Sequence, residues 1–252
     1  PVFLQERQNA IAELIAEQGR VAVSDLAARF DVSEDCIRKD LKQLVEEGRA
    51  KKVYGGAIRP EAAPERVVLN RVDTNADAKR AIAERAYALI EPGDTVFLDV
   101  SSTNHYLAQL LAAGDTRCQV VSTMIDILQI LAANPLVTAV GTGGTVNREL
   151  NGFVGARTVE ALGPLRFDRA FIAALGVDAV SGDVLTFDAD DGIVKRCALE
   201  RSREAYLVAD AEKFGAWGTY AYGNVRDFTA VITAPATPAL VKSLEEAGAV
   251  VL

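Results

Sequence analysis

Residues 23–57 read VSDLAARFDVSEDCIRKDLKQLVEEGRAKKVYGGA, and this stretch decides the fold of the N-terminal region. Ser24 is a suitable N-cap for a short helix over residues 25–30. Ser33 then caps a longer helix, whose apolar residues at 37, 41, 44 and 45 follow helical spacing. Two capped helices with a four-residue break, preceded by an amphipathic helix that ends at Gly19, are the layout of a helix-turn-helix.

Basic residues follow the apolar stripe of the third helix. Arg38, Lys39 and Lys42 lie away from that stripe, where a recognition helix reaches base edges and phosphates. The next segment, residues 49–57, reads RAKKVYGGA and is typical of a short basic β-ribbon with a glycine corner. We interpret this ribbon as a wing, whose lysines would follow the DNA backbone.

The net charge of −8 does not exclude DNA as a partner, because the charge is unevenly distributed. Residues 1–60 hold ten basic and ten acidic side chains, whereas residues 61–252 hold 17 basic and 25 acidic ones. Protein charges act on DNA phosphates over a Debye length of roughly 10 Å, so the charge near the binding surface matters more for DNA binding than the net charge of the chain.

The composition also limits the other classes of protein. Three widely spaced cysteines without a CxxC pair, and one histidine, disfavour both a zinc site and a disulfide framework. No apolar run approaches the roughly 20 residues of a membrane span. We therefore expect a cytoplasmic protein with no metal, no cofactor and no membrane partner.

Residues 58–75 contain two prolines and mixed charge, which is typical of a linker. Beyond it, strand-like runs alternate with helical patterns. This alternation predicts an α/β domain over residues 76–252, with a mostly parallel sheet flanked by helices, after a winged helix-turn-helix over residues 1–57. The expected strands are 95–100, 119–122, 137–141, 169–174, 205–209 and 230–233, and the expected helices are 77–90, 104–113, 125–133, 191–202 and 238–247.

Polar loops follow three of these strands. Residues 101–104 read SSTN and open a helix, residues 122–123 read ST, and residues 141–145 read GTGGT. Hydroxyls and amide groups at a helix N-terminus suit an anion such as phosphate, and glycines allow a close backbone approach. Lys195 and Lys213 are equally compatible with holding phosphate as point charges and with being solvated.

Both regions resemble the DeoR family of sugar-metabolism repressors. The residues that carry this resemblance are Val32-Ser-Glu-Asp-Cys-Ile-Arg-Lys-Asp-Leu41 with the Gly-Gly-Ala wing, and, in the second domain, GDTVFLDVSSTN, GTGGTVNRELNGFVG, IVKR and LVADAEKFG. The second domain of that family is in turn similar to ribose-5-phosphate isomerase. The sequence departs from the family pattern in both regions. Cys36 and Lys39 replace Thr and Arg in the first. In the expected ligand shell of the second, Ser101-Ser-Thr-Asn104 stands where the family has a run such as Gly-Thr-Thr-Thr, and Met124 replaces an Asn.

The resemblance implies a repressor that binds double-stranded operator DNA, senses a small phosphorylated sugar or similar metabolite, and forms a homo-oligomer (dimer or tetramer). The residues expected at DNA are Ser24, Ser33, Glu34, Arg38, Lys39, Lys42, Lys51, Lys52 and Tyr54. The residues expected at the effector are Asp99, Ser101, Ser102, Thr103, Asn104, Thr123, Gly143, Gly144, Asp178, Lys195 and Lys213. We expect no catalytic residue.

Two alternatives remain at this point. A sugar-phosphate isomerase fused to a DNA-binding module would need a carboxylate to move a proton and a cation to stabilise the oxyanion. No arrangement in the sequence singles out such a pair. An adaptor that uses the winged helix to bind protein would show no steep salt dependence with nucleic acid.

Overall fold

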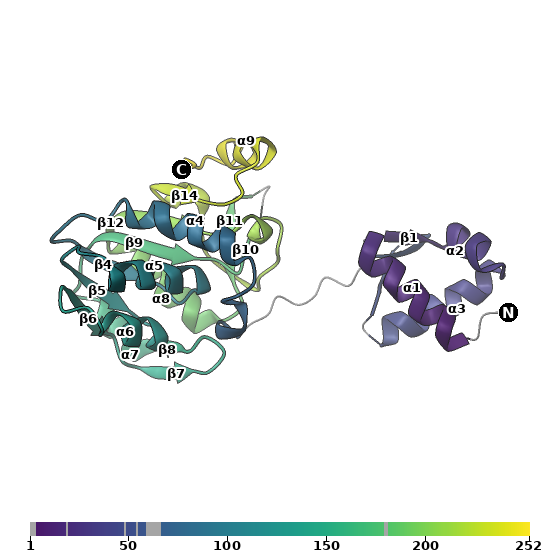
Figure 1. Cartoon of the computed structure of the whole chain (residues 1–252), viewed down its shortest axis with the longest axis horizontal. Helices are drawn as coiled ribbons and strands as arrows, with labels where there is room; N and C mark the ends of the chain where they lie inside the picture. The colour runs from purple at the N-terminus through teal and green to yellow at the C-terminus, as the bar shows by residue number, and fades with distance from the viewer. Residues whose placement is uncertain (1–3, 19, 48, 54, 59–66, 179–180) are drawn as a thin grey trace. The chain divides into compact units, whose positions relative to one another are not determined.

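A computed structural model describes residues 4–18, 20–47, 49–53, 55–58, 67–178 and 181–252 (Figure 1). The chain divides into two compact units, Pro1–Pro64 and Glu65–Leu252, each of which is considered by itself. In the described parts, no helix combines the length and the apolar character that crossing a bilayer requires.

The first unit contains three helices and a small antiparallel sheet. The helices are α1 (Leu4–Gln18), α2 (Val23–Phe30) and α3 (Glu34–Glu46), and the strands are β1 (Arg20–Ala22), β2 (Lys51–Val53) and β3 (Gly56–Ile58), paired in the order β1-β3-β2. Ile11, Leu26, Ile37 and Leu44 are buried together in its core. This arrangement is the predicted winged helix-turn-helix.

The caps of α2 and α3 differ. The Ser33 hydroxyl accepts a hydrogen bond from the Cys36 amide at 3.3 Å, which confirms the predicted start of α3. The prediction of Ser24 as a cap is wrong, because β1 runs directly into α2, which begins at Val23. The Val23 amide donates to the Gly55 carbonyl at 2.9 Å, and the Ser24 hydroxyl donates to Asp25 instead.

The second unit is built around a six-stranded parallel sheet with the order β14-β12-β9-β4-β5-β6. Its strands are β4 (Thr95–Leu98), β5 (Cys118–Ser122), β6 (Val137–Gly141), β9 (Phe167–Ala173), β12 (Ser202–Val208) and β14 (Ala230–Ile232). All six lie where the sequence predicts them, and the predicted fold class is confirmed.

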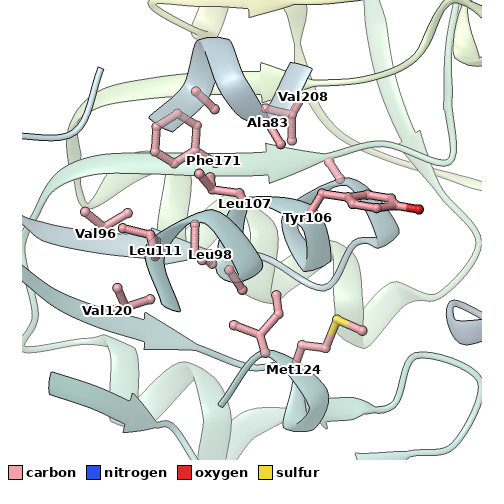
Figure 2. Close-up of a cluster of buried hydrophobic side chains, with 14 of the residues drawn as sticks. Ala83, Val96, Leu98, Tyr106, Leu107, Leu111, Val120, Met124, Phe171 and Val208 are labelled. Atoms are coloured by element: carbon pink, nitrogen blue, oxygen red, sulfur yellow. The ribbon is translucent and has the colours of Figure 1, made fainter. Parts of the chain in front are cut away.

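Helices cover both faces of this sheet (Figure 1). α4 (Ala76–Tyr87), α5 (Ser102–Ala113) and α6 (Ile125–Leu131) pack on one face, and α7 (Ala156–Leu162) and α8 (Ala189–Glu200) pack on the other. Val96 and Leu98 point into the first layer, shown in Figure 2, whereas Phe97 between them points into the second. This alternation explains why the strands read as unbroken apolar runs.

Smaller elements were not predicted. These are the hairpin β7 (Thr145–Asn147) and β8 (Gly152–Val154), the antiparallel sheet of β10 (Gly176–Val177), β11 (Asp183–Thr186) and β13 (Tyr220–Asn224), and the 3₁₀ turns η1 (Leu69–Arg71), η2 (Ala211–Lys213) and η3 (Val225–Asp227). The predicted C-terminal helix is present as α9 (Pro238–Glu246).

The end of the predicted linker belongs to the second unit. Val68 is fully buried in the same cluster as Leu98, and its amide donates to the Glu149 carbonyl at 2.7 Å. The Tyr106 hydroxyl donates to the Val72 carbonyl at 3.1 Å. Residues 67–75 therefore pack on this unit, since Val68 is buried in its core and Val72 packs against that core despite the mixed charge around them.

Candidate DNA-binding surface and sensor pocket

The exposed face of α3 carries the predicted DNA-binding cations. Arg38 lies between two carboxylates: its Nη2 is 2.5 Å from Glu34 Oε2, and its Nη1 is 2.8 Å from Asp35 Oδ1. Lys42 is 3.7 Å from Glu46, and all of these side chains are largely open to water. The helix thus presents both signs of charge where a recognition helix meets base edges.

A groove of about 510 Å³ separates α3 from the wing. Its floor is apolar, and its walls carry four cations and one carboxylate; the lining is Val23, Asp35, Arg38, Lys39, Leu41, Lys42, Val45, Lys52, Gly55 and Gly56. The expected contact Tyr54 and the side chain of Lys51 lie outside the described residues. The charged walls of the groove suit a phosphate backbone.

A buried ion pair holds α1 against α3. Arg7 Nε donates to Asp40 Oδ2 at 2.6 Å, and Gln8 donates to Asp40 Oδ1 at 3.2 Å. This hydrogen bond raises the pKa of Arg7 against the opposing effect of burial. Asp40 is buried, with its side chain only 1% exposed. Cys36 lies beside this pair, 3.2 Å from Arg7 Nη2.

In the second unit, the strand order reverses between β4 and β9. From β4 the chain proceeds through β5 and β6 to one edge, and then from β9 through β12 and β14 to the other. Parallel sheets bind ligands beyond the carboxyl ends of the strands at such a switch point. Asn104 holds β9 and the end of β4 together here. Its side-chain amide donates to the carbonyls of Asp99 at 3.0 Å and Phe171 at 2.9 Å.

A small pocket lies at this switch point, with a cavity of about 30 Å³. Five of the predicted effector residues line it: Ser101, Ser102, Thr103, Lys195 and Lys213. The sequence analysis missed four further polar lining residues, Arg71, Thr186, Asp191 and Asp210. Asp191 and Asp210 had a signal, because each lies just beyond the end of a strand.

Lys195 occupies the buried end of the pocket between two carboxylates. Its Nζ bonds Asp99 Oδ2 and lies 3.5 Å from Asp191 Oδ1, and all three residues are nearly inaccessible to water. Asp99 Oδ2 also accepts from the Ala173 amide, and Asp191 Oδ2 accepts from the Thr186 hydroxyl at 2.7 Å. Lys195 is thus neutralised within the protein.

Burial and charge oppose each other in this cluster. Burial raises the pKa of Asp191 to about 6, although the positive charge of Lys195 lowers it. Burial lowers the pKa of Lys195, but attraction to Asp191 and Asp99 outweighs it, so the net pKa is raised. Lys195 therefore keeps its proton, while Asp191 titrates near neutrality.

The opposite side of the pocket is richer in cations. Lys213 and Arg71 line it together with Asp210, and Lys79 lies behind them with its Nζ donating to the carbonyls of Arg71 and Thr74. Burial lowers the pKa of Lys79 to about 8 and also lowers the pKa of Lys213. A further anion at this place would favour the charged form of both lysines.

The structure does not bring the remaining predicted effector residues into the pocket lining. The Asn104 side chain is used in the hydrogen bonds at the switch point described above. Thr123 is buried beneath β8, and its carbonyl accepts a hydrogen bond from the Phe153 amide. Gly143 and Gly144 form a left-handed turn tied to Thr158, and the Asp178 carboxylate accepts a hydrogen bond from the Ser181 amide. Asp99 contacts the pocket only through Lys195. Met124, expected in the ligand shell, is a core residue (Figure 2).

Two known domain families match this chain, over nearly the same residues as its two compact units. The DeoR C terminal sensor domain matches residues 74–234, and the DeoR-like helix-turn-helix domain matches residues 7–63. The chain belongs to the DeoR family. This DeoR-family chain is therefore a helix-turn-helix transcriptional regulator, and the recognition made from the sequence is confirmed.

Curated relatives extend over almost the whole DeoR-family chain. The HTH-type transcriptional repressor CsqR of Escherichia coli (strain K12) is 28% identical over 237 residues, which cover 94% of this chain and 90% of that protein. The glycerol-3-phosphate regulon repressor of the same organism is 28% identical, over 90% of both chains. The HTH-type transcriptional regulator YgbI is 33% identical, over 92% of this chain and 91% of that protein. These relatives are transcription regulators and not enzymes.

Solved structures resemble the sensor region of the DeoR-family chain only distantly. Ribose 5-phosphate isomerase A of Neisseria gonorrhoeae has a TM-score of 0.38 at 15% identity, over 54% of this chain and 52% of that one. The enzyme from Methanocaldococcus jannaschii has a TM-score of 0.41 at 15% identity, over 56% and 55%. Among the described residues, no group of three or more His, Cys, Asp or Glu side chains is placed to hold a metal ion.

Proposed function

We propose that this protein acts in the cytoplasm as a repressor of a carbohydrate-metabolism operon and that a phosphorylated sugar, or a related metabolite, bound in the sensor pocket controls its affinity for operator DNA. The observation that carries the proposal is the pocket at the switch point. It combines the N-terminus of α5 with Arg71 and Lys213, while carboxylates lie beside them. One of the relatives is named a glycerol-3-phosphate regulon repressor, which also supports a phosphorylated effector.

The cations and carboxylates of the pocket suit the two parts of a sugar phosphate. A phosphate fits against Arg71, Lys213 and the first turn of α5, where cations and the positive end of the helix dipole meet. Asp191 and Asp210 are acceptors, which suit sugar hydroxyls. Lys195 is already neutralised by two carboxylates, so its role in this proposal is to orient Asp191 and not to hold the phosphate.

The small volume of the pocket makes ligand binding conformationally selective. A cavity of about 30 Å³ holds only one or two water molecules, so a sugar phosphate needs the lining to move apart. A ligand shifts an equilibrium only if it binds one state better than the other. Arg71 belongs to residues 67–75, through which the sensor joins the chain that leads to the DNA-binding unit. Movement of this segment would link the pocket to DNA.

The experiment is fluorescence-polarisation binding of the full chain to duplex DNA from its own promoter region, with a panel of sugar phosphates added. We expect salt-sensitive binding that one compound weakens by about 5- to 150-fold, as a coupling of roughly 1–3 kcal/mol requires. The Lys213→Gln variant should lose the response while retaining DNA affinity. Lys242→Gln is the matched control, because Lys242 is 77% exposed on α9.

Two results would contradict the proposal. DNA affinity that no phosphorylated sugar changes would remove the effector part, and DNA affinity without salt dependence would remove the repressor part. We further propose a homo-oligomer, dimer or tetramer, because DNA readers of this kind match two-fold symmetry to paired half-sites. Light scattering on the purified chain measures this, and a monomer at micromolar concentration would contradict it.

A further inference from the structure

Arg38 differs from the other cations of the DNA-binding surface in its immediate neighbours. Its guanidinium lies between Glu34 and Asp35, at 2.5 and 2.8 Å, so the three side chains together carry a net charge of −1. Two of its five N–H donors are occupied by these carboxylates, and three remain. Because 57% of the Arg38 side chain is exposed, those donors are accessible from water.

Lys39 and Lys52 have a different environment. Within the described part of the chain, neither forms an ion pair, and both are exposed. Lys42 has one carboxylate, at the longer distance of 3.7 Å. These lysines line the groove between α3 and the wing with their positive charge uncompensated or weakly compensated.

A DNA phosphate and a base edge respond differently to these two environments. A phosphate that approached Arg38 would also come within a Debye length of Glu34 and Asp35, so the trio offers it no net attraction. The O6 and N7 atoms of guanine are neutral acceptors, so the neighbouring carboxylates do not repel them in this way. The paired cytosine presents an N4 amino group, which a carboxylate accepts.

We propose that Arg38, Glu34 and Asp35 form a reader of one G·C base pair, and that Lys39, Lys42 and Lys52 hold phosphates. Arg38 donates to guanine, Glu34 accepts from the cytosine amino group, and Asp35 holds the guanidinium in place. The position of the trio agrees with this role, since the first turns of a recognition helix reach base edges. The inference rests on DNA binding by the first unit, as proposed above.

The first experiment selects duplexes from a random-sequence library with the full-length protein and with its Arg38→Gln and Lys52→Gln variants. Wild type should select a motif with an invariant G·C pair. Arg38→Gln should make that one position degenerate and leave the other positions unchanged, whereas Lys52→Gln should keep the whole motif. If Arg38→Gln keeps the G·C requirement, the proposal is wrong.

The second experiment replaces the selected guanine with 7-deazaguanine, which lacks the N7 acceptor. A good bidentate contact corresponds to roughly 5- to 150-fold in affinity, so wild type should lose binding in this range. Arg38→Gln should lose about as much on the normal duplex and nothing further on the modified one. If Arg38→Gln and 7-deazaguanine each lowered the affinity independently, so that their fold-losses multiplied when combined, the assignment of Arg38 to this guanine would be wrong.

The third experiment measures the dependence of non-specific DNA affinity on salt. Lys52→Gln should reduce the slope of log affinity against log salt by about 0.9, and Arg38→Gln should leave it unchanged. The Glu34→Ala/Asp35→Ala double variant should bind random DNA more tightly, with a slope about 0.9 steeper, because Arg38 is then free for a phosphate. If Arg38→Gln reduced the salt slope as much as Lys52→Gln does, Arg38 would be assigned to a phosphate instead. Absence of DNA binding by wild type would overturn this inference together with the proposed repressor.

Discussion

Arg38 and Lys195 each lie between two carboxylates, but water reaches only one of the two clusters. The Arg38, Glu34 and Asp35 side chains are 57%, 49% and 83% exposed, whereas those of Lys195, Asp99 and Asp191 are 4%, 0% and 3% exposed. Exposed ion pairs contribute little to stability and exchange partners readily. Buried ones cannot lose one partner without leaving a charge uncompensated. The same three-charge arrangement therefore serves recognition on α3 and structure in the sensor.

The largest expected effect comes from breaking the buried cluster. Lys195→Met should lower the free energy of unfolding by about 3–5 kcal/mol, because Asp99 and Asp191 lose their shared counter-ion. Urea unfolding followed by circular dichroism measures this. Arg196→Met is the matched control on the same helix, since Arg196 is half-exposed and 3.8 Å from Glu200, and we expect a change of about 0.5 kcal/mol at most. Equal losses of unfolding free energy in Lys195→Met and Arg196→Met would contradict the difference between buried and exposed ion pairs.

The pH dependence of stability tests the same cluster. Burial raises the pKa of Asp191 from 3.8 to about 6, so its contribution to stability is fully present below about pH 4 and is lost as pH rises through 6. Relative to Asp191→Asn, wild type should lose about 3 kcal/mol between pH 4 and pH 7. Unfolding at a series of pH values gives this difference. Asp190→Asn changes an exposed carboxylate of α8 and keeps Asp191, so wild type compared with this control should show no such difference.

A smaller effect is expected where a pocket cation meets the ligand. Arg71→Gln should weaken binding of the responsive sugar phosphate roughly 10- to 100-fold, since a hydrogen bond to a charged group contributes about 1.5–3 kcal/mol. Isothermal titration calorimetry measures the affinity. Arg80→Gln is the control, because Arg80 pairs with Asp77 outside the pocket. An unchanged affinity in Arg71→Gln would place the phosphate elsewhere.

The smallest effect is expected on α3. Arg38→Gln should change the free energy of unfolding by less than about 0.5 kcal/mol, because its two ion pairs are exposed. Thermal unfolding of wild type and variant at matched pH decides this. A loss above about 2 kcal/mol would show that the exposed trio is structural and would remove the distinction from Lys195.

The main elements of both units could be predicted from the sequence because their signals are local. The inner strands of the parallel sheet are apolar runs buried on both faces, and the α3 cap needs only Ser33 and its neighbours. The β10-β11-β13 sheet could not be predicted, since its strands are short and β11 pairs with β13 across more than thirty residues. For the same reason the buried pair of Arg7 and Asp40 was not predicted, because its two members lie on different helices.

The candidate site could be predicted in part. Ser101–Thr103 could be predicted because they follow a strand and open a helix, whereas Lys195 and Lys213 stayed open on spacing alone and were assigned through the resemblance to the family. Arg71 was missed, because it comes from a segment whose prolines and mixed charge resemble a linker. Thr123 and Asn104 were assigned to the ligand through the resemblance to the family, but their surroundings are closed by β8 and by the carbonyls of Asp99 and Phe171.

The packing of residues 67–75 sets the length of the connection between the two units. While Val68 stays in the sensor core, the connecting chain ends there, one residue beyond residue 67, where the described part of this unit starts. Release of the nine residues 67–75 would add up to about 30 Å of reach. Effective concentration falls as a tether lengthens beyond the span it must bridge. A ligand that draws Arg71 away from its present place would thereby act on DNA affinity through chain length, with no change on the DNA-binding surface itself.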